Sequence, residues 1–267
     1  MGEVAEPLPT SGPGLSAVPN MRDVGGHELP DGGRIASGVV FRSSHLQGLS
    51  SQGEALLASI GIGTAVDLRS SAERAGGGYQ LPAGATGVWL DVLADNPDSA
   101  AAFSRLFGQG KLQTISAHDT ESFMLNSYRD MVDLPSARSA YRRTFEIIAE
   151  PASGVVLIHC TAGKDRTGWA SAVLQLWLGM DEADVRADYL RSNEQQPEMI
   201  GELVAAFVAA GGDPAAVANL VTVRGDYLDL ALERVAESHG TVDQYFRRGL
   251  GLSDETLSRL QDRLVLG

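Results

Sequence analysis

A run of four apolar residues in the second half of the chain limits the fold more than any other segment. Val155-Val156-Leu157-Ile158 has no polar side chain on either face, as expected of a strand that is buried on both sides. A glycine-containing turn follows, and residues 167–178 continue as an apolar helix. A strand of this kind leading into a helix is typical of a parallel sheet covered by helices.

Other segments support the same fold class. Short strands are expected at 38–42, 64–68 and 88–90, and helices at 49–60 and 136–149. Ser50 or Ser51 is expected to cap the first helix, and Gly61 to end it. The sequence therefore predicts an α/β fold with a central, mostly parallel sheet flanked by helices.

The two ends of the chain differ in character. Residues 1–19 are rich in Pro, Gly and Ser and are expected to be flexible, whereas residues 20–267 are expected to form a single domain. Residues 91–121 are polar and irregular enough to form a long surface excursion. The C-terminal third is expected to be helical and to cover the sheet, and a separate C-terminal domain is the alternative. Its helices should break at Pro197, Gly211-Gly212, Pro214 and Gly240.

Charge and cysteine content exclude several functions. The formal net charge of −13 argues against nucleic-acid binding, which needs concentrated Lys and Arg. The single cysteine excludes an intramolecular disulfide and a zinc site built from several thiolates. No apolar run is long enough to span a bilayer, so no integral membrane contact is expected. Residues 1–20 lack a signal-peptide pattern, so we expect a cytoplasmic protein, and export without such a signal stays open.

The turn after the apolar strand carries the strongest chemical signal. Cys160 follows the strand, five residues intervene, and Arg166 stands at the start of the helix. A phosphate monoester needs several converging donors, which the backbone N–H groups of a tight loop at a helix start provide. These donors come from Thr161, Ala162, Gly163 and Lys164. The same donors and the helix dipole favour a thiolate at Cys160, and the planar Arg166 fork can grip two phosphate oxygens.

Three further residues have expected roles in this loop. Gly163 lets the backbone approach the ligand. Thr167 can place its hydroxyl near the sulfur and stabilise it as a leaving group. His159 is expected to fix the loop through hydrogen bonds to backbone atoms, because a thiolate needs no base.

The loop has two alternative interpretations. A lone cysteine is usually a small buried hydrophobe, but the flanking strand, Gly163, Arg166 and Thr167 favour a reactive thiol. Gly163-Lys164 is similar to part of a nucleotide-binding Walker loop. That motif needs Gly where the chain has Ile158 and Ser or Thr where it has Asp165, so it is rejected.

The stretch from His159 to Gly168 resembles the signature of the protein tyrosine phosphatase superfamily. Its Ala-Gly-Lys-Asp-Arg core is similar to that of the atypical bacterial tyrosine and phosphoinositide phosphatases. Five other segments resemble the same family: Asn20-Met21-Arg22-Asp23-Val24, Phe41-Arg42-Ser43-Ser44, Asp67-Leu68-Arg69-Ser70-Ser71, Asp188-Tyr189-Leu190-Arg191-Ser192-Asn193 and Val223-Arg224-Gly225-Asp226-Tyr227-Leu228. The resemblance covers nearly the whole chain, except for residues 91–121.

The resemblance implies a role for each loop residue. It makes Cys160 the nucleophile, Arg166 the phosphate clamp and Asp165 the general acid, and it links Lys164 to phosphoinositide headgroups. An exposed, solvated charge is the alternative for Lys164. It also implies that helices within residues 194–222 form a lid. Asp165 has a structural alternative as a helix-start carboxylate. The competing candidates for the acid are Asp91 and Asp95.

The residues around the loop are expected to be structural. Arg42, Asp67 and Arg69 are interpreted as an ion-pair set that braces the loop. Tyr128 and Met131 are interpreted as core residues, with the pocket lining as the alternative.

The predicted function is hydrolysis of phosphate monoesters through a phosphocysteine, with no metal or cofactor. The expected substrates are phosphotyrosine in proteins, phosphoinositide headgroups or both. A small phosphorylated metabolite or nucleotide is the alternative substrate. A silent phosphate-binding module is the alternative function, and a sulfur-transferring enzyme is a more distant one because Arg166 and Thr167 suit a phosphate ester better than a persulfide.

Overall fold

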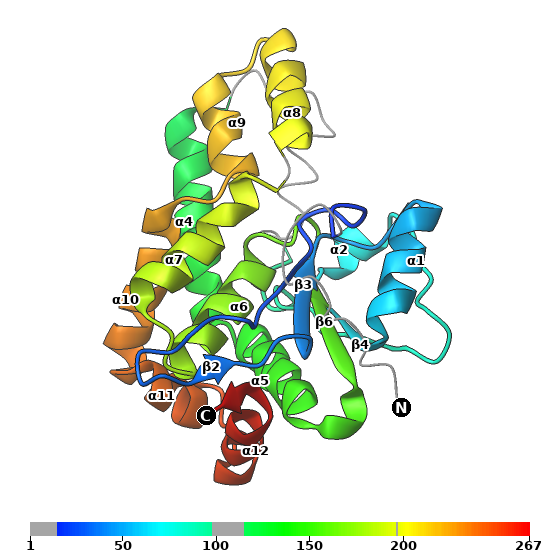
Figure 1. Cartoon of the computed structure of the whole chain (residues 1–267). Coiled ribbons are helices and arrows are strands. Elements are labelled where there is room, and N and C mark those ends of the chain that lie inside the picture. The colour runs from blue at the N-terminus through cyan, green and yellow to red at the C-terminus, as the bar shows by residue number, and fades with distance from the viewer. Residues whose placement is uncertain (1–14, 98–114, 196) are drawn as a thin grey trace.

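Five strands form the central sheet in the computed structural model of the chain, which describes residues 15–97, 115–195 and 197–267 (Figure 1). In spatial order they are β1 (Arg22–Asp23), β3 (Val40–Ser43), β6 (Val155–His159), β4 (Ile62–Asp67) and β5 (Thr86–Trp89). The last four run parallel, and β1 pairs antiparallel with β3. The mostly parallel α/β fold that the sequence predicts is confirmed.

The apolar strand β6 lies in the middle of the sheet. Val156, Leu157 and Ile158 have no exposed surface, as expected of a strand covered on both faces. Leu157 packs in an apolar cluster with α1, whereas Val156 and Ile158 pack in a larger cluster on the other side. Figure 1 shows α1 on one side of the sheet and α5 and α6 on the other.

The helices and remaining short elements surround this sheet. The helices are α1 (Ser51–Ile60), α2 (Ser71–Arg74), α4 (Ala117–Asp133), α5 (Pro135–Ala149), α6 (Arg166–Trp177), α7 (Glu182–Leu190), α8 (Pro197–Ala209), α9 (Pro214–Val221), α10 (Gly225–His239), α11 (Val242–Gln244) and α12 (Asp254–Leu264). The short elements are η2 (Pro151–Ser153), η3 (Arg191–Asn193), η4 (Tyr245–Gly249) and the antiparallel pair β2 (Arg34–Ile35) and β7 (Val265–Leu266). None of the helices in the described part of the chain combines the length and hydropathy that crossing a bilayer demands.

The predicted strands and helices are confirmed with end points within two residues of those expected. Helix α1 shows why the local signals work. The Ser50 side chain accepts a hydrogen bond from the Gly53 amide and caps the helix start. Gly61 adopts φ 74° and donates its amide to Ala58, which ends the helix in the left-handed conformation that glycine adopts most readily.

One helix contradicts the sequence interpretation. The expected excursion at 91–121 includes the start of α4, which opens with a capping box between Ser116 and Asp119. Residues 98–114 lie outside the described residues. Thr120, Met124 and Tyr128 are buried at a spacing of four, and this helical period was the missed signal.

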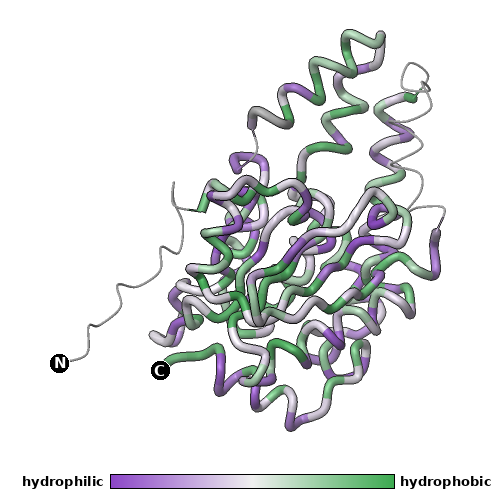
Figure 2. The backbone as a smooth tube through the Cα atoms, turned by 90° about the vertical axis from the view of Figure 1, so that its right-hand side faces the viewer, coloured by the Kyte–Doolittle hydropathy of each residue, from purple (hydrophilic) through white to green (hydrophobic). Residues whose placement is uncertain are grey.

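The C-terminal third is helical, and its expected breaks are confirmed. Pro197 and Pro214 stand at the first positions of α8 and α9, where a proline costs no hydrogen bond. These two helices project from one end of the molecule in both views (Figure 1, Figure 2). At the other end of the chain, Leu15 and Val18 are buried in the apolar cluster beside α1, and residues 1–14 lie outside the described residues.

Candidate active site

The predicted phosphate loop leaves the sheet where three parallel strands end together. Ser43 of β3 and Asp67 of β4 both stand level with His159 of β6. Residues 160–165 then connect β6 to the start of α6. The carboxyl end of a parallel sheet is where α/β proteins bind ligands, so the topology places the loop at the expected edge.

Gly163 is required by the path of the loop. Its φ is +67°, and an added Cβ would lie 2.2 Å from the carbonyl oxygen of Ser43. No other residue fits this position without displacing backbone. The loop therefore lies directly against the end of β3.

Three successive carbonyl groups of the loop, those of residues 161–163, accept hydrogen bonds. The donors are, in order, the His45 amide at 3.0 Å, the Asn20 side-chain amide at 3.0 Å and the Arg42 guanidinium at 2.8 Å. The C=O and N–H of a trans peptide point in opposite directions. The amides of residues 162–164 are therefore turned away from these donors.

Arg42 belongs to a buried ion cluster behind the loop. Asp188 accepts a hydrogen bond from Arg22 Nε at 3.0 Å, and Arg42 Nη1 lies 3.5 Å from its other oxygen. All three side chains are at most 2% exposed. Burial, and then the neighbouring Arg22, lower the pKa of Arg42 to about 9. Against the effect of burial, the two arginines hold the pKa of Asp188 below its usual range.

This cluster corrects the expected ion-pair set. Arg42 does not pair with Asp67 but with Asp188, which sequence reasoning did not select. Asp67 pairs instead with Arg69, whose Nε and Nη2 donate to both carboxylate oxygens at 3.0 and 2.9 Å. The expected set is therefore two separate structures: Arg42 contacts the loop at the Gly163 carbonyl oxygen, and Asp67 lies beside His159 at the end of β6.

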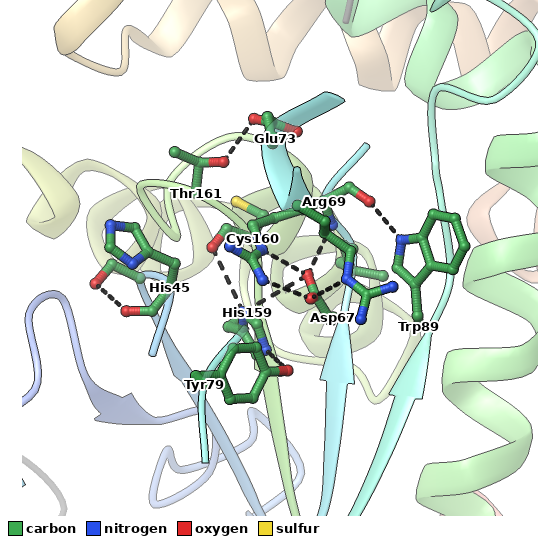
Figure 3. A network of polar contacts seen from close by, with 12 residues as sticks. His45, Asp67, Arg69, Glu73, Tyr79, Trp89, His159, Cys160 and Thr161 are labelled. Carbon is green, nitrogen blue, oxygen red and sulfur yellow. Dashed lines mark hydrogen bonds and ion pairs between the residues drawn. The ribbon is translucent and has the colours of Figure 1, made fainter. Parts of the chain in front are cut away.

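His159 joins the second of these structures (Figure 3). Its Nε2 lies 2.7 Å from the Tyr79 hydroxyl, and its Nδ1 lies 3.5 Å from the Cys160 carbonyl oxygen. Asp67 Oδ1 is 3.9 Å from the same Nδ1. Burial lowers the pKa of His159 to about 4, so the ring is neutral at physiological pH. Tyr79 was not foreseen as its partner.

A pocket opens beside the loop, and its lining is polar on the side of the loop and apolar elsewhere. Thr161, Ala162, Lys164, Asp165 and Arg166 of the loop line one side, with Glu73 and Ser127 nearby. The rest of the lining is apolar and consists of Leu93, Phe123, Met124, Met131 and Leu220. Met131 thus lines the pocket as well as the core. Cys160 itself is 1% exposed.

Arg166 is held by a residue that sequence reasoning missed. Its Nη1 and Nη2 donate to the two carboxylate oxygens of Glu73 at 2.5 and 2.7 Å. Thr161 Oγ1 donates to the same carboxylate at 2.5 Å. Against the effect of burial, Arg166 lowers the pKa of Glu73 far below its usual range, so Glu73 stays ionised and cannot supply a proton. Glu73 also forms a capping box with Ser70, and this local helix-start role gives no signal of a contact with Arg166.

Asp165 lies beside the pocket and has two partners of different kinds. Lys164 Nζ is 2.9 Å from Oδ1 and 2.8 Å from Oδ2. The Tyr128 hydroxyl donates to Oδ1 at 2.9 Å. Lys164 also reaches the carbonyl oxygen of Thr222, 3.3 Å away at the end of α9. Tyr128 is therefore a buried residue with a direct contact to the candidate acid.

The competing acids Asp91 and Asp95 are engaged elsewhere. Asp91 accepts hydrogen bonds from the amides of Ser71 and Leu93, both at 2.9 Å. Asp95 accepts the Ser136 amide at 2.7 Å. Neither residue lines the pocket.

Thr167 stands at the second position of α6 and is fully buried. Its hydroxyl oxygen has no hydrogen-bond partner among the described residues, Cys160 included. The buried hydroxyl is therefore not committed to another structural contact in this state.

Comparison with known proteins shows the family of this chain. The profile of the tyrosine phosphatase family matches residues 13–266. A Cupriavidus necator protein whose name assigns it to the tyrosine-protein phosphatases is 31% identical over 88% of this chain and 83% of its own length. The triple specificity protein phosphatase PtpB of Mycobacterium tuberculosis is 32% identical over 86% of this chain and 92% of its own. A tyrosine-protein phosphatase of Nostoc commune is 26% identical over 98% and 91%.

The chain therefore belongs to the tyrosine phosphatase family, as the resemblance of its loop indicated. Members of this family are phosphoric monoester hydrolases, and phosphorylated compounds are their substrates.

Proposed function

We propose that the protein hydrolyses aryl phosphate monoesters, above all phosphotyrosine, through a phosphocysteine at Cys160. The observation that carries the proposal is the loop itself. It sets a lone thiol at the end of β6, it turns successive amides away from β3, and it places Arg166 at the pocket. An anion bound here would meet the amides and the guanidinium together.

The pairing of Arg166 with Glu73 is compatible with phosphate binding. Nη1 donates to Glu73 and to the Leu68 carbonyl oxygen, and Nη2 uses one of its two protons on Glu73. The second Nη2 proton and the Nε proton then form an edge with two parallel donors that have no hydrogen bond to a described residue. Glu73 holds the fork from one side while the other edge faces the ligand, as a bidentate phosphate contact requires.

The reaction has two displacements at phosphorus. The Cys160 thiolate attacks, the bond from phosphorus to the ester oxygen breaks, and Asp165 gives its proton to that oxygen. Water then attacks the phosphocysteine and loses a proton to Asp165, and the phosphorus–sulfur bond breaks to release inorganic phosphate and the thiolate. The unpartnered Thr167 hydroxyl is suited to stabilise the departing sulfur.

The apolar wall supports an aromatic ester as the substrate. Phe123, Met124 and Leu220 would bury the ring of a phosphotyrosine, whereas the short ester of phosphoserine would leave this surface unfilled. A phosphoinositide is a second candidate, because Lys164 lies in the pocket and can meet an additional phosphate. In the free protein, however, Lys164 is paired with Asp165.

Cys160→Ser tests the proposal. It should lower kcat by roughly a thousandfold or more while phosphotyrosine peptides still bind, because a serine hydroxyl is not ionised near neutral pH. Arg166→Lys should lower kcat/KM about 30-fold, which corresponds to a loss of about 2 kcal/mol in transition-state stabilisation, since a point charge replaces two parallel donors. Arg186→Lys, at a surface ion pair, is the matched control.

The measurement is kcat/KM in EDTA for phosphotyrosine, phosphoserine, phosphoinositide and nucleotide substrates. Absence of turnover of p-nitrophenyl phosphate by the wild-type protein would make it a silent binding module. Activity retained by Cys160→Ser would exclude the phosphocysteine. A preference for phosphoinositides would reverse the order of the two substrate candidates.

We also propose that α8 and α9 act as the lid of a single domain, which includes Leu15 and Val18 because both are buried in its core. The Asn193 side chain donates a hydrogen bond to the Val223 carbonyl oxygen and accepts one from the Val223 amide. These two bonds join the ends of the segment that contains α8 and α9. Leu220 of α9 lines the pocket, and Thr222 contacts Lys164. A movement of the helix pair would therefore change the pocket wall.

A further inference from the structure

Two buried tyrosines from different helices form a chain that ends at Asp165. The Tyr128 hydroxyl of α4 lies 2.9 Å from Asp165 Oδ1 and 2.6 Å from the Tyr189 hydroxyl of α7. Both tyrosine side chains are completely buried. The family resemblance assigns neither of them a role.

The direction of the Tyr128–Asp165 and Tyr128–Tyr189 hydrogen bonds follows from the single proton that each phenol can donate. A phenol has one proton to donate, and an ionised carboxylate can only accept. Tyr128 therefore donates to Asp165 and accepts from Tyr189. Burial, and then the charge of Asp165, raise the pKa of each phenol well above its usual value, so both stay protonated.

Packing fixes the positions of the two phenols. The ring of Tyr128 lies against Tyr227, with centroids 5.4 Å apart. Tyr189 packs on Gly168 in the first turn of α6, where an added Cβ would lie 3.3 Å from the ring. Helices α6, α7 and α10 thus hold the hydroxyl that α4 presents to Asp165.

This contact distinguishes the two oxygens of the carboxyl group. Lys164 is nearly equidistant from both, whereas Tyr128 touches only Oδ1. When Asp165 is protonated, its carbonyl oxygen is a better hydrogen-bond acceptor than its hydroxyl oxygen, so the contact of Tyr128 with Oδ1 favours the proton on Oδ2. An acid that carries its proton mainly on one oxygen is already oriented for transfer.

We propose that Tyr128, backed by Tyr189, is a positioning residue that directs the transferable proton of Asp165 to Oδ2. This inference rests on the proposed function, in which Asp165 protonates the leaving oxygen. It adds a role for two residues outside the loop and explains why a phenol is buried against the acid.

The test compares substrates that differ in their need for a proton. The ratio of kcat/KM for phenyl phosphate to that for 2,4-dinitrophenyl phosphate measures the help given to a basic leaving oxygen. Tyr128→Phe should lower this ratio about tenfold and Tyr189→Phe about threefold, with kcat affected more than KM. Tyr227→Phe, which removes the hydroxyl of the adjacent phenol without a contact to Asp165, should leave the ratio unchanged.

A double variant establishes that Tyr128 acts through the acid. In the Asp165→Asn background, Tyr128→Phe should lower the ratio no further, because the two changes interrupt one interaction. An additive loss would overturn the proposal, as would a Tyr128→Phe ratio equal to that of Tyr227→Phe. If Tyr128→Phe does not fold, the Tyr189→Phe comparison decides in the same way.

Failure of the proposed function gives a different result. If Asp165→Asn itself leaves the ratio unchanged, Asp165 is not the acid and the assignment in the proposed function is wrong. If Asp165→Asn lowers the ratio and neither tyrosine variant does, the acid stands and only the positioning role falls.

Discussion

Charged side chains hold the loop from two sides, and the two sets differ in burial. Behind the loop is the rear cluster of Arg22, Arg42 and Asp188, with side chains at most 2% exposed. At the pocket are the pairs Arg166–Glu73 and Lys164–Asp165, whose side chains are 9–24% exposed. In the rear cluster one anion faces two buried cations, and the partly exposed Arg191 also lies 3.7 Å from Asp188, whereas each pocket cation has its own carboxylate.

The difference in burial suggests different roles for the two sets of charges. Charges enclosed by protein cannot exchange partners with a ligand, and removing one leaves the others unpaired at high cost. Charges at the wall of a pocket keep contact with water and can turn toward a substrate. We therefore expect the rear cluster to determine where the loop lies and the pocket pairs to determine what it binds. The predictions below test this division.

The largest effect is expected from Asp188→Asn. It leaves two buried arginines without an anion and should reduce the free energy of unfolding by about 3–5 kcal/mol, measured by urea denaturation. The control is Asp229→Asn, which breaks a half-exposed pair with Arg186 and should cost at most about 1 kcal/mol. Equal losses in the two variants would show that the rear cluster does not hold the loop.

A smaller effect is expected from Gly163→Ala. Its positive φ costs about 1 kcal/mol in any non-glycine residue, and the contact with the Ser43 carbonyl oxygen should add about 1–3 kcal/mol through overpacking. Gly61→Ala is the matched control, because Gly61 has φ 74° and an added Cβ would meet nothing within 4 Å. Urea denaturation should therefore show a larger loss for Gly163→Ala, together with weaker binding of inorganic phosphate. Similar losses would mean that the loop can move away from β3.

The smallest effect concerns pH. The pKa of His159 is about 4 in the folded protein and 6.5 in the unfolded chain, so between these values only the unfolded state takes up a proton. Stability should fall as pH falls, by about 2 kcal/mol from this residue between pH 7 and pH 5.

The measurement is the difference in unfolding free energy between the two pH values. His159→Gln should remove most of this pH dependence. His45→Gln serves as the comparison, because burial lowers the pKa of that half-buried histidine as well. A pH dependence unaffected by His159→Gln would mean that the ring is protonated inside the protein.

Local patterns were sufficient to predict the sheet, most helices and the position of the loop. The apolar run before Cys160 and the caps of α1 are encoded by neighbouring residues. Glu73 and Arg166, in contrast, are 93 residues apart and meet only because β4 and β6 are adjacent strands. No pattern within one segment reports such a contact.

The same limitation explains the other misses. Asp188 stands in a segment that resembles the family, but no contact is predicted for it, because its two buried arginine partners come from β1 and β3. Tyr128 was interpreted as core, which its burial confirms, but its hydroxyl contact with Asp165 depends on how α4 lies across the loop. Sequence reasoning therefore located the loop and missed the distant side chains that contact it.

The strand order has a consequence for how the protein acquires activity. β6 lies between β3 and β4, although β3 ends 112 residues and β4 ends 88 residues before β6 begins. Neither neighbour can complete its parallel pairing until β6 arrives, and pairings of such long sequence separation form slowly. Catalytic competence should thus be among the last properties to return during refolding, later than helix content. A nascent chain on the ribosome has no site until this strand has emerged.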